Sequence, residues 1–311
     1  MRRWLARGLV AASVVAAALA VASRTGAVRA LERRALVRWL EATTGAHVAL
    51  GGVGGTLGHS LVLEDLQLAA GGRTVAQVPR LEIVYAPLSL LRGVLRVKRV
   101  TLTGPRVRAA VEGDAGSRAL PAGGGLPVQV DRLEVIDGRV AVALLDTEPP
   151  RRFAATALTL AARGRLDRGG AALEVAALRF VPRGLALAPV AAAGRVTASP
   201  GGPVRLSAFR LASGRSRLDA DAVLDRAGAV DAHLVLAPLA VADVRALAPR
   251  AELATDLRAR VRMRGPWHAL AVAAHADLGR GGGLHARAVL DATARPVAYA
   301  ARLAFARLDP G

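Results

Sequence analysis

Histidine and aspartate are the residues in this 311-residue sequence whose types could support catalysis or metal binding. The histidines are scattered, and no His-Glu-x-x-His motif of the kind that holds zinc is present. Asp219 and Asp221 resemble the paired acids of some metal sites, but strand alternation places both on one solvent-facing side beside Arg217. We therefore expect no metal site, and surface positions on strands for the histidines, which are His47, His59, His233, His268, His275 and His285.

Other catalytic motifs are also missing from the sequence. The glycines of residues 51–55 do not complete a G-x-G-x-x-G loop for phosphate, and no β-α-β unit follows them. Lys98 is the only lysine and follows no glycine, so there is no Walker A loop, and no serine lies in a Gly-x-Ser-x-Gly elbow. Without cysteine there is no thiol nucleophile, disulfide or thiolate zinc site. These absences predict a protein that is not an enzyme and needs no cofactor.

The charge of the chain suggests a membrane partner. The sequence has 43 basic and 24 acidic residues and a formal net charge of +19, which fits a nucleic-acid or membrane partner. Single-strand nucleic-acid binders interleave basic residues with aromatic side chains, whereas aromatic residues are 3% of this chain and lie far apart. Residues 1–44 hold eight arginines and two glutamates, hence +6, which leaves 19 − 6 = +13 for the rest. We therefore expect no nucleic-acid partner.

The amino terminus is typical of a targeting or anchoring segment, which we place at residues 1–24. Residues 8–22 carry no charge over fifteen positions, which suits a signal peptide, whereas a spanning helix needs about 20 residues. Counting from Trp4 gives nineteen residues if Arg7 reaches the membrane interface. Ala20 and Ala22 form a small-x-small cleavage pattern, so cleavage and retention both stay open. If the segment is retained, its anchor residues are Trp4, Leu5, Leu9, Val10, Val14, Val15 and Leu19.

Residues 25–45 predict an amphipathic helix. Val28, Leu31, Leu36 and Trp39 recur at helical spacing, and Gly45 stands where a helix C-cap is expected. A basic amphipathic helix beside a membrane segment can lie on anionic lipid. It can also close the end of the sheet that follows, and this second interpretation is the one we favour.

From residue 46 to residue 311 the hydrophobic period is that of β-strands. Turn signals every ten to fifteen residues, at 104–105 and 200–203 for example, and the lack of long helical crossovers predict an antiparallel meander. Asp137 and Gly138 predict a hairpin turn. Short helices are expected at 87–92, before Gly93, and at 239–247, and a flexible loop near 112–125.

A single curved antiparallel sheet lined by Val, Leu and Ala would form an elongated apolar groove. Residues 257–264 give the clearest pattern, with apolar residues on one face and arginines on the other. We interpret those arginines as a solvated outer face, with contact to anionic headgroups as the alternative. Soluble proteins rarely expose large apolar patches unless these bind something. The predicted groove lining is Leu257, Val261, Met263, Val297, Tyr299, Leu303 and Phe305.

In order and context, the amino-terminal half resembles the AsmA-like family, and within it the amino-terminal part of TamB-type (translocation and assembly module) members. The resemblance covers about residues 46–111, through the patterns Gly-Gly-Thr-Leu at 54–57, Leu-Val-Leu-Glu-Asp-Leu-Gln-Leu at 61–68 and Pro-Leu-Ser-Leu-Leu-Arg-Gly at 87–93. A second stretch, 126–138, is similar to the segment that usually comes next. Beyond residue 150 the similarity is one of style only.

The resemblance implies a single-pass inner-membrane protein of the Gram-negative envelope, with most of the chain in the periplasm. It implies movement of phospholipid between the inner and outer membranes, with membrane phospholipids as partners. The alternative is a non-enzymatic scaffold for the assembly of outer-membrane β-barrel proteins or for protein secretion, with such a barrel as partner. TamB-type chains are far longer, whereas here the strand rhythm still runs at 308–311, so we expect either an incomplete chain or a short family member.

Overall fold

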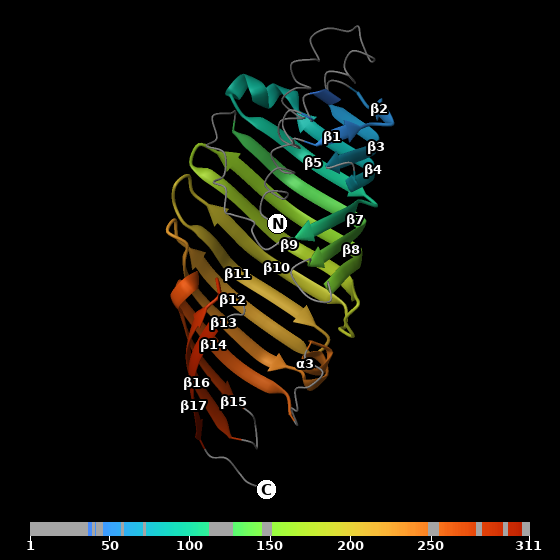
Figure 1. Cartoon of the computed structure of the whole chain (residues 1–311). Coiled ribbons are helices and arrows are strands. Elements are labelled where there is room, and N and C mark those ends of the chain that lie inside the picture. The colour runs from blue at the N-terminus through green and yellow to red at the C-terminus, as the bar shows by residue number, and fades with distance from the viewer. Residues whose placement is uncertain are drawn as a thin grey trace. The chain divides into compact units, whose positions relative to one another are not determined.

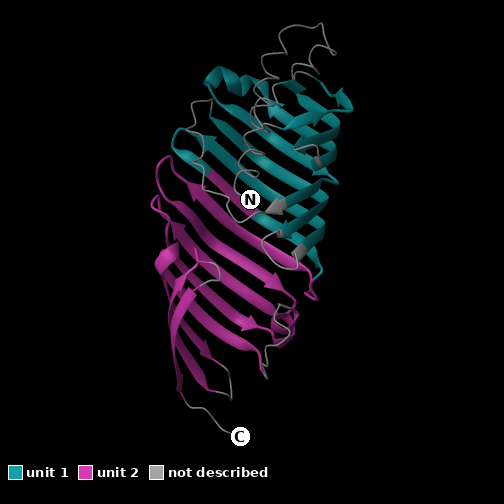
Figure 2. Cartoon of the chain, viewed as in Figure 1, with its two compact units in different colours: residues 1–171, 176–184 teal, residues 172–175, 185–311 magenta. Residues whose placement is uncertain are grey.

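The computed structural model describes residues 37–38, 41, 46–56, 59–70, 73–111, 127–144, 151–247, 255–277, 282–294 and 298–306. Strands dominate these residues (Figure 1), so the prediction of a mainly β protein is confirmed. The chain divides into two compact units (Figure 2). Unit 1 contains Met1–Ala171 and Ala176–Gly184, and unit 2 contains Ala172–Val175 and Leu185–Gly311.

Several expected amino-terminal features lie outside the described residues. These are the membrane segment 1–24 with its anchor side chains and most of the helix 25–45. The predicted loop 112–125 also lies outside the described residues. Val37, Arg38 and Glu41 are helical. No helix in the described part of the chain combines the length and apolar character needed to cross a membrane.

The strands of unit 1 are mostly long, and they alternate between buried and exposed residues. In β3, for example, Leu61 and Leu63 are buried while Val62 and Glu64 are more exposed. Such alternation is what a sheet with one covered face produces. The strands are β1 (His47–Ala49), β2 (Gly52–Gly54), β3 (Ser60–Ala70), β4 (Arg73–Ala86), β5 (Leu95–Thr103), β6 (Arg106–Val111), β7 (Val128–Leu144), β8 (Arg151–Asp167) and β9 (Gly170–Arg183), the last of which contributes residues to both units.

The prediction of a wholly antiparallel sheet is wrong for unit 1. Strand β7 runs parallel to β5 and to β6, and antiparallel to β8. A parallel connection needs about a dozen residues or more, and residues 112–127, between β6 and β7, supply that length. The sequence pattern of residues 112–125 predicts a loop, so it carried no sign of parallel pairing.

The Asp137-Gly138 hairpin prediction is also wrong, because β7 continues through both residues. Asp137 has a φ of 51°, and the register with β8 shifts on either side of Gly138, so the pair forms a bulge. Gly104 and Pro105 do separate two strands, as predicted, but β5 and β6 continue as one interrupted line beside β4 and β7. A Cβ on Gly138 would lie 3.3 Å from Pro105 Cγ. The irregularity inside β7 therefore lies beside the break between β5 and β6.

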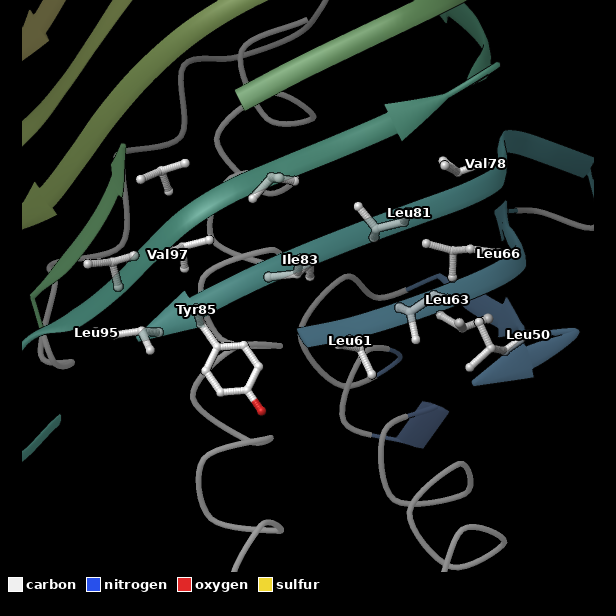
Figure 3. Packing of buried hydrophobic residues seen from close by; sticks show 14 residues of the cluster. Leu50, Leu61, Leu63, Leu66, Val78, Leu81, Ile83, Tyr85, Leu95 and Val97 are labelled. Carbon is white, nitrogen blue, oxygen red and sulfur yellow. The ribbon is translucent and has the colours of Figure 1, made fainter. Parts of the chain in front are cut away.

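One apolar face of unit 1 forms a closed core. Leu63 and Ile83 are 0% exposed, and Tyr85 is 1% exposed. Figure 3 shows these side chains, with others from β3, β4 and β5, gathered along the strands. Val37 from the amino-terminal helical residues and Leu90 pack against the cluster. Val37 therefore covers part of this apolar face, and most of the predicted helix 25–45 lies outside the described residues.

Leu90 belongs to η1 (Pro87–Arg92), a 3-10 helix that starts at a proline, as predicted. It ends at Gly93, whose φ of 69° is the left-handed conformation that glycine adopts without strain. Leu90 O and Ser89 O accept hydrogen bonds from the backbone that follows, at 2.9 Å and 3.3 Å. The cap therefore directs the chain into β5, and Leu95 at its start is fully buried.

In unit 2 each strand pairs antiparallel with its neighbour in chain order, so the meander prediction is confirmed there (Figure 2). A helix was expected at 239–247, and one is present two residues later at its start. The elements are β10 (Val190–Ala198), β11 (Val204–Ser213), β12 (Ser216–Leu224), β13 (Ala229–Leu239), α3 (Val241–Leu247), β14 (Leu257–Pro266), η2 (Trp267–Ala269), β15 (Leu270–Asp277), β16 (Gly283–Asp291) and β17 (Ala298–Ala306).

Candidate functional site

The candidate site is one face of the unit 2 sheet, which the register makes apolar from β11 to β17. Side chains of directly paired residues point to the same face of a sheet. Following the register across the seven strands gives one unbroken row, which runs Phe209, Ala220, Leu234, Val261, Ala274, Ala286 and Leu303. The adjacent row runs Leu211, Leu218, Leu236, Ala259, Ala276, Leu284 and Phe305.

Two further rows complete what we call the apolar face. One contains Leu206, Ala222, Ala232, Met263, Val272, Ala288 and Ala301. The other contains Val204, Leu224, Val230, Leu270, Leu290 and Tyr299. No polar side chain interrupts these four rows. Strand spacing and rise give the face dimensions of about 29 Å by about 20 Å.

The apolar face is only partly buried. Val230, Ala232 and Leu270 are buried and form a small cluster with Leu234 and Met263, among others. Within the described residues of unit 2, the members of this cluster all come from strands of the one sheet. Exposure is greatest in β17, where Tyr299 is 74%, Leu303 61% and Phe305 55% exposed. The exposed part of the apolar face is therefore concentrated at its outer strand, β17.

Sequence reasoning identified two strands of this surface, the central strand β14 and the outer strand β17. Leu257, Val261 and Met263 lie on the apolar face of β14, and all three are half-buried. The expected alternation of β14 is confirmed, because all four intervening arginines are exposed. Tyr299, Leu303 and Phe305 lie on the same face of β17, while Val297 is outside the described residues. The structure thus brings the six described members of the predicted lining onto one face.

The predicted lining missed the other five strands of the face, which are β11, β12, β13, β15 and β16. Phe209, Leu234, Leu236, Val272 and Leu290 belong to it but were not among the predicted residues. Each lies in a strand with the same period-2 pattern, which is the signal that could have found it. Alanine hid this signal. In β15, for example, alanines stand on both faces, so the two faces differ little in hydrophobicity.

The opposite face of the unit 2 sheet is charged and solvent-exposed. Several arginines there have carboxylate partners, such as Arg210 with Asp219 at 3.7 Å and Arg264 with Asp231 at 2.8 Å. Asp291 ends β16 and accepts hydrogen bonds from Thr293 Oγ1 at 2.5 Å and from Thr293 N at 2.9 Å. These bonds favour the carboxylate and lower the pKa of Asp291. This face can attract anions, whereas the apolar face can only bind apolar groups.

Two candidate catalytic groups of unit 2 are in contact, His275 and His285, whose Nδ1 atoms lie 3.3 Å apart. Asp219 and Asp221 lie on one exposed face, as predicted, where Asp221 Oδ1 accepts a hydrogen bond from Ala208 N at 2.8 Å. All six histidines are exposed, although His59 lies in a turn and His268 in η2 instead of in strands. In the described ranges, no three His, Asp or Glu side chains are placed to hold a metal ion.

Comparison of the whole chain with protein-family models and with curated protein sequences finds no match. The geometry of the two faces therefore carries the functional argument together with the sequence resemblance.

Proposed function

We propose that this protein binds membrane phospholipid, with the acyl chains held on the apolar face of unit 2. The protein would act as a membrane-anchored conduit in the periplasm of a Gram-negative cell, moving phospholipid between the inner and outer membranes. The observation that carries the proposal is the unbroken apolar surface across seven strands, whose outer strand leaves Leu303 61% exposed.

Desolvation supplies the binding energy in this proposal. Each CH₂ group removed from water contributes about 0.8 kcal/mol, so a chain of several methylenes lying along the face is held without any polar contact. Alanines such as Ala274 and Ala286 keep the surface shallow between the larger Leu and Val side chains. A lining without polar interruptions allows an acyl chain to slide, since no position is strongly preferred. No covalent step is required.

The test is the phospholipid content of the full chain purified from a Gram-negative membrane, measured by mass spectrometry. Val261→Asp and Leu303→Asp each place a charge on the apolar face, and we expect co-purifying phospholipid to be lost in both. Burying a carboxylate against acyl chains is strongly unfavourable. Unchanged lipid content in both variants would overturn the proposal.

Strand β15 offers a matched control. Ala274 lies on the apolar face and Ala271 on the opposite face, so Asp substitutions at the two positions differ only in the face they charge. We expect Ala274→Asp to lose lipid and Ala271→Asp to keep it. Circular dichroism of both variants separates loss of lipid from loss of the fold.

A second function rests on β17, which favours a scaffold role. Among the described strands, β17 pairs only with β16, and all of its residues are exposed. An exposed strand edge can add a strand from another protein. We propose as the alternative that this edge receives a strand of an outer-membrane β-barrel protein during its assembly.

Photocrosslinking separates the two functions. A crosslinker at Ala300 of β17 reports strand addition, and one at Ala271 in the interior strand β15 serves as the control. Crosslinks to an outer-membrane barrel from Ala300 alone, in protein that carries no phospholipid, favour the scaffold. Phospholipid on the protein with no barrel crosslink from either position favours the conduit.

A further inference from the structure

A basic hollow lies over the charged face of unit 2, between two rows of charged-face residues. The row between them, which consists of Val261, Ala274, Ala286 and Leu303 of the apolar face, also belongs to its lining. Its volume is about 610 Å³, and strands β13 to β17 line it. Neither Asp nor Glu is among its lining residues. We call this site the basic hollow after its arginine and histidine side chains. These are Arg260, Arg262, Arg287, Arg302, His233, His275 and His285.

The strand register explains how these side chains meet. His233 pairs with Arg262, Arg262 with Ala273, Ala273 with Arg287, and Arg287 with Arg302, which makes one row across five strands. The next row pairs Arg260 with His275 and His275 with His285. Residues of neighbouring rows lie about 7–8 Å apart along the diagonal. Long arginine side chains from both rows therefore reach a common centre.

Among the described residues, three of the four arginines in the basic hollow have no ion-pair partner, and the fourth, Arg262, has only a long one. Asp231 lies 2.8 Å from Arg264, outside the hollow, and 4.0 Å from Arg262. Among the described residues, no carboxylate forms an ion pair with Arg260, Arg287 or Arg302. This differs from Arg195, Arg210 and Arg215 elsewhere in unit 2, each of which has an acidic partner within 4.0 Å.

Arg287 and Arg302 face each other directly across β16 and β17. Like charges in such a pair destabilise a sheet. His275 Nδ1 and His285 Nδ1 are also in contact, at 3.3 Å, with ring centres 4.3 Å apart. A hydrogen bond between the two Nδ1 atoms contains a single proton. It cannot form between two charged imidazoles, which would repel each other. An anion bound beside Arg287 and Arg302 would offset the repulsion between these two arginines.

We propose that the basic hollow binds a phosphate group. The planar fork of arginine matches phosphate oxygens in a bidentate way, and several arginines around one hollow suit an anion with more than one charge and oxygens on all sides. The phosphate can be free in solution or part of an anionic lipid headgroup. This proposal does not depend on the proposed function, because the side chains involved lie on the other face of the sheet.

The first experiment titrates the full chain with inorganic phosphate at low ionic strength, with sodium chloride at matched ionic strength as the reference. Calorimetry measures the affinity, and the imidazole resonances of His275 and His285 report the place. We expect saturable binding that Arg287→Gln with Arg302→Gln weakens at least tenfold, since each charge-assisted hydrogen bond contributes about a factor of ten or more.

The matched control is Arg258→Gln, on the same face of β14 but outside the basic hollow. It removes one arginine from the strand and should leave the affinity for phosphate within about twofold. The pair Arg287→Lys and Arg302→Lys keeps the charge but loses the fork, and we expect an intermediate affinity. Equal phosphate affinity in the wild type and in the double Gln variant, or no saturable binding at all, would falsify the proposal.

Vesicles identify the source of the phosphate. Binding of the full chain to phosphatidylglycerol vesicles is compared between the double Gln variant and Arg258→Gln, so that the basic amino terminus contributes equally. Weaker vesicle binding of the double variant alone assigns the hollow to a lipid headgroup. Equal vesicle binding, with loss of inorganic phosphate binding, assigns it to a soluble phosphate compound.

Discussion

Unit 1 and unit 2 use the same strand pattern but treat their apolar faces differently. In unit 1 the face is covered, with Leu63 and Ile83 at 0% exposure and with Val37 and Leu90 packed against it from outside the strands. In unit 2 the members of the described buried cluster all come from strands of the same sheet, and Leu303 is 61% exposed. The contrast teaches that alternation makes a face apolar, while a covering layer decides whether it becomes a core.

Side-chain size accompanies this difference. Unit 1 places Leu, Ile and Tyr at the centre of its cluster, whereas the apolar face of unit 2 contains many alanines. Small side chains bury little area each and leave room above the sheet. Unit 2 uses buried polar groups to attach α3 to the sheet. Asp243 of α3 accepts a hydrogen bond at 2.5 Å from Oγ of Ser216, the first residue of β12. The apolar face of unit 1 therefore forms a core, whereas the apolar face of unit 2 remains a partly exposed surface.

The largest effect should separate the two faces directly. Leu63→Ala in unit 1 should cost about 2–5 kcal/mol, because it leaves a cavity in a closed core. Leu303→Ala in unit 2 should change stability by no more than about 0.5 kcal/mol, because that side chain is mainly in water. Hydrogen exchange of peptides from β3 and from β17 measures the local stability of unit 1 and of unit 2 separately. Comparable losses at the two positions would show that the face of unit 2 is also a closed core.

The next effect tests the polar fixation of unit 2. Asp243→Ala removes the acceptor of Ser216 Oγ, a hydroxyl that also accepts a hydrogen bond from Ala240 N at 2.8 Å. We expect a loss of about 1–3 kcal/mol, because a buried donor is left without a partner. Asp219→Ala removes an exposed acid and should cost less than about 1 kcal/mol. Urea unfolding of both variants provides the comparison, and similar small losses would contradict a structural role for Asp243.

A smaller effect, of opposite sign, concerns the charged face. Arg302→Glu replaces a like-charge pair with an opposite-charge pair across β16 and β17, and should stabilise unit 2 by about 0.2–1 kcal/mol. The same change should abolish phosphate binding in the basic hollow. A gain in stability together with a loss of binding is expected where repulsion is kept for function. Destabilisation in urea would argue that Arg287 and Arg302 do not repel each other.

The last effect is confined to alkaline solution and to unit 1. Burial raises the pKa of the Tyr85 phenol above its ordinary value of 10.0. The unfolded chain therefore ionises first, so the contribution of Tyr85 is fully present below pH 10 and is lost as the pH rises through the higher folded pKa. Tyr85→Phe should flatten the alkaline stability profile of β4. A profile identical to that of the wild type would contradict this.

Some elements were readable from local sequence alone. The alternation of β14, the helix at Pro87–Arg92 with its glycine cap and the helix near 241–247 followed from residue types a few positions apart. The Asp137-Gly138 turn failed because Asp137 and Gly138 have two uses, a turn or a bulge, and long-range pairing chooses between them. The parallel pairing of β7 was not predicted. The direction of a strand depends on the end of the sheet at which the chain re-enters it, and local sequence does not contain this information.

The sequence by itself determined which residues share a face and what chemistry each face can have, because a strand alternates its side chains with a period of two. It determined that arginine and histidine would lie opposite leucine, valine and alanine along unit 2. Only the tertiary structure decided that the face of unit 1 is covered while that of unit 2 leaves apolar side chains in water. Only the register placed Arg287 against Arg302 and His275 against His285. Both decisions depend on contacts between residues distant in the chain, which no local pattern contains.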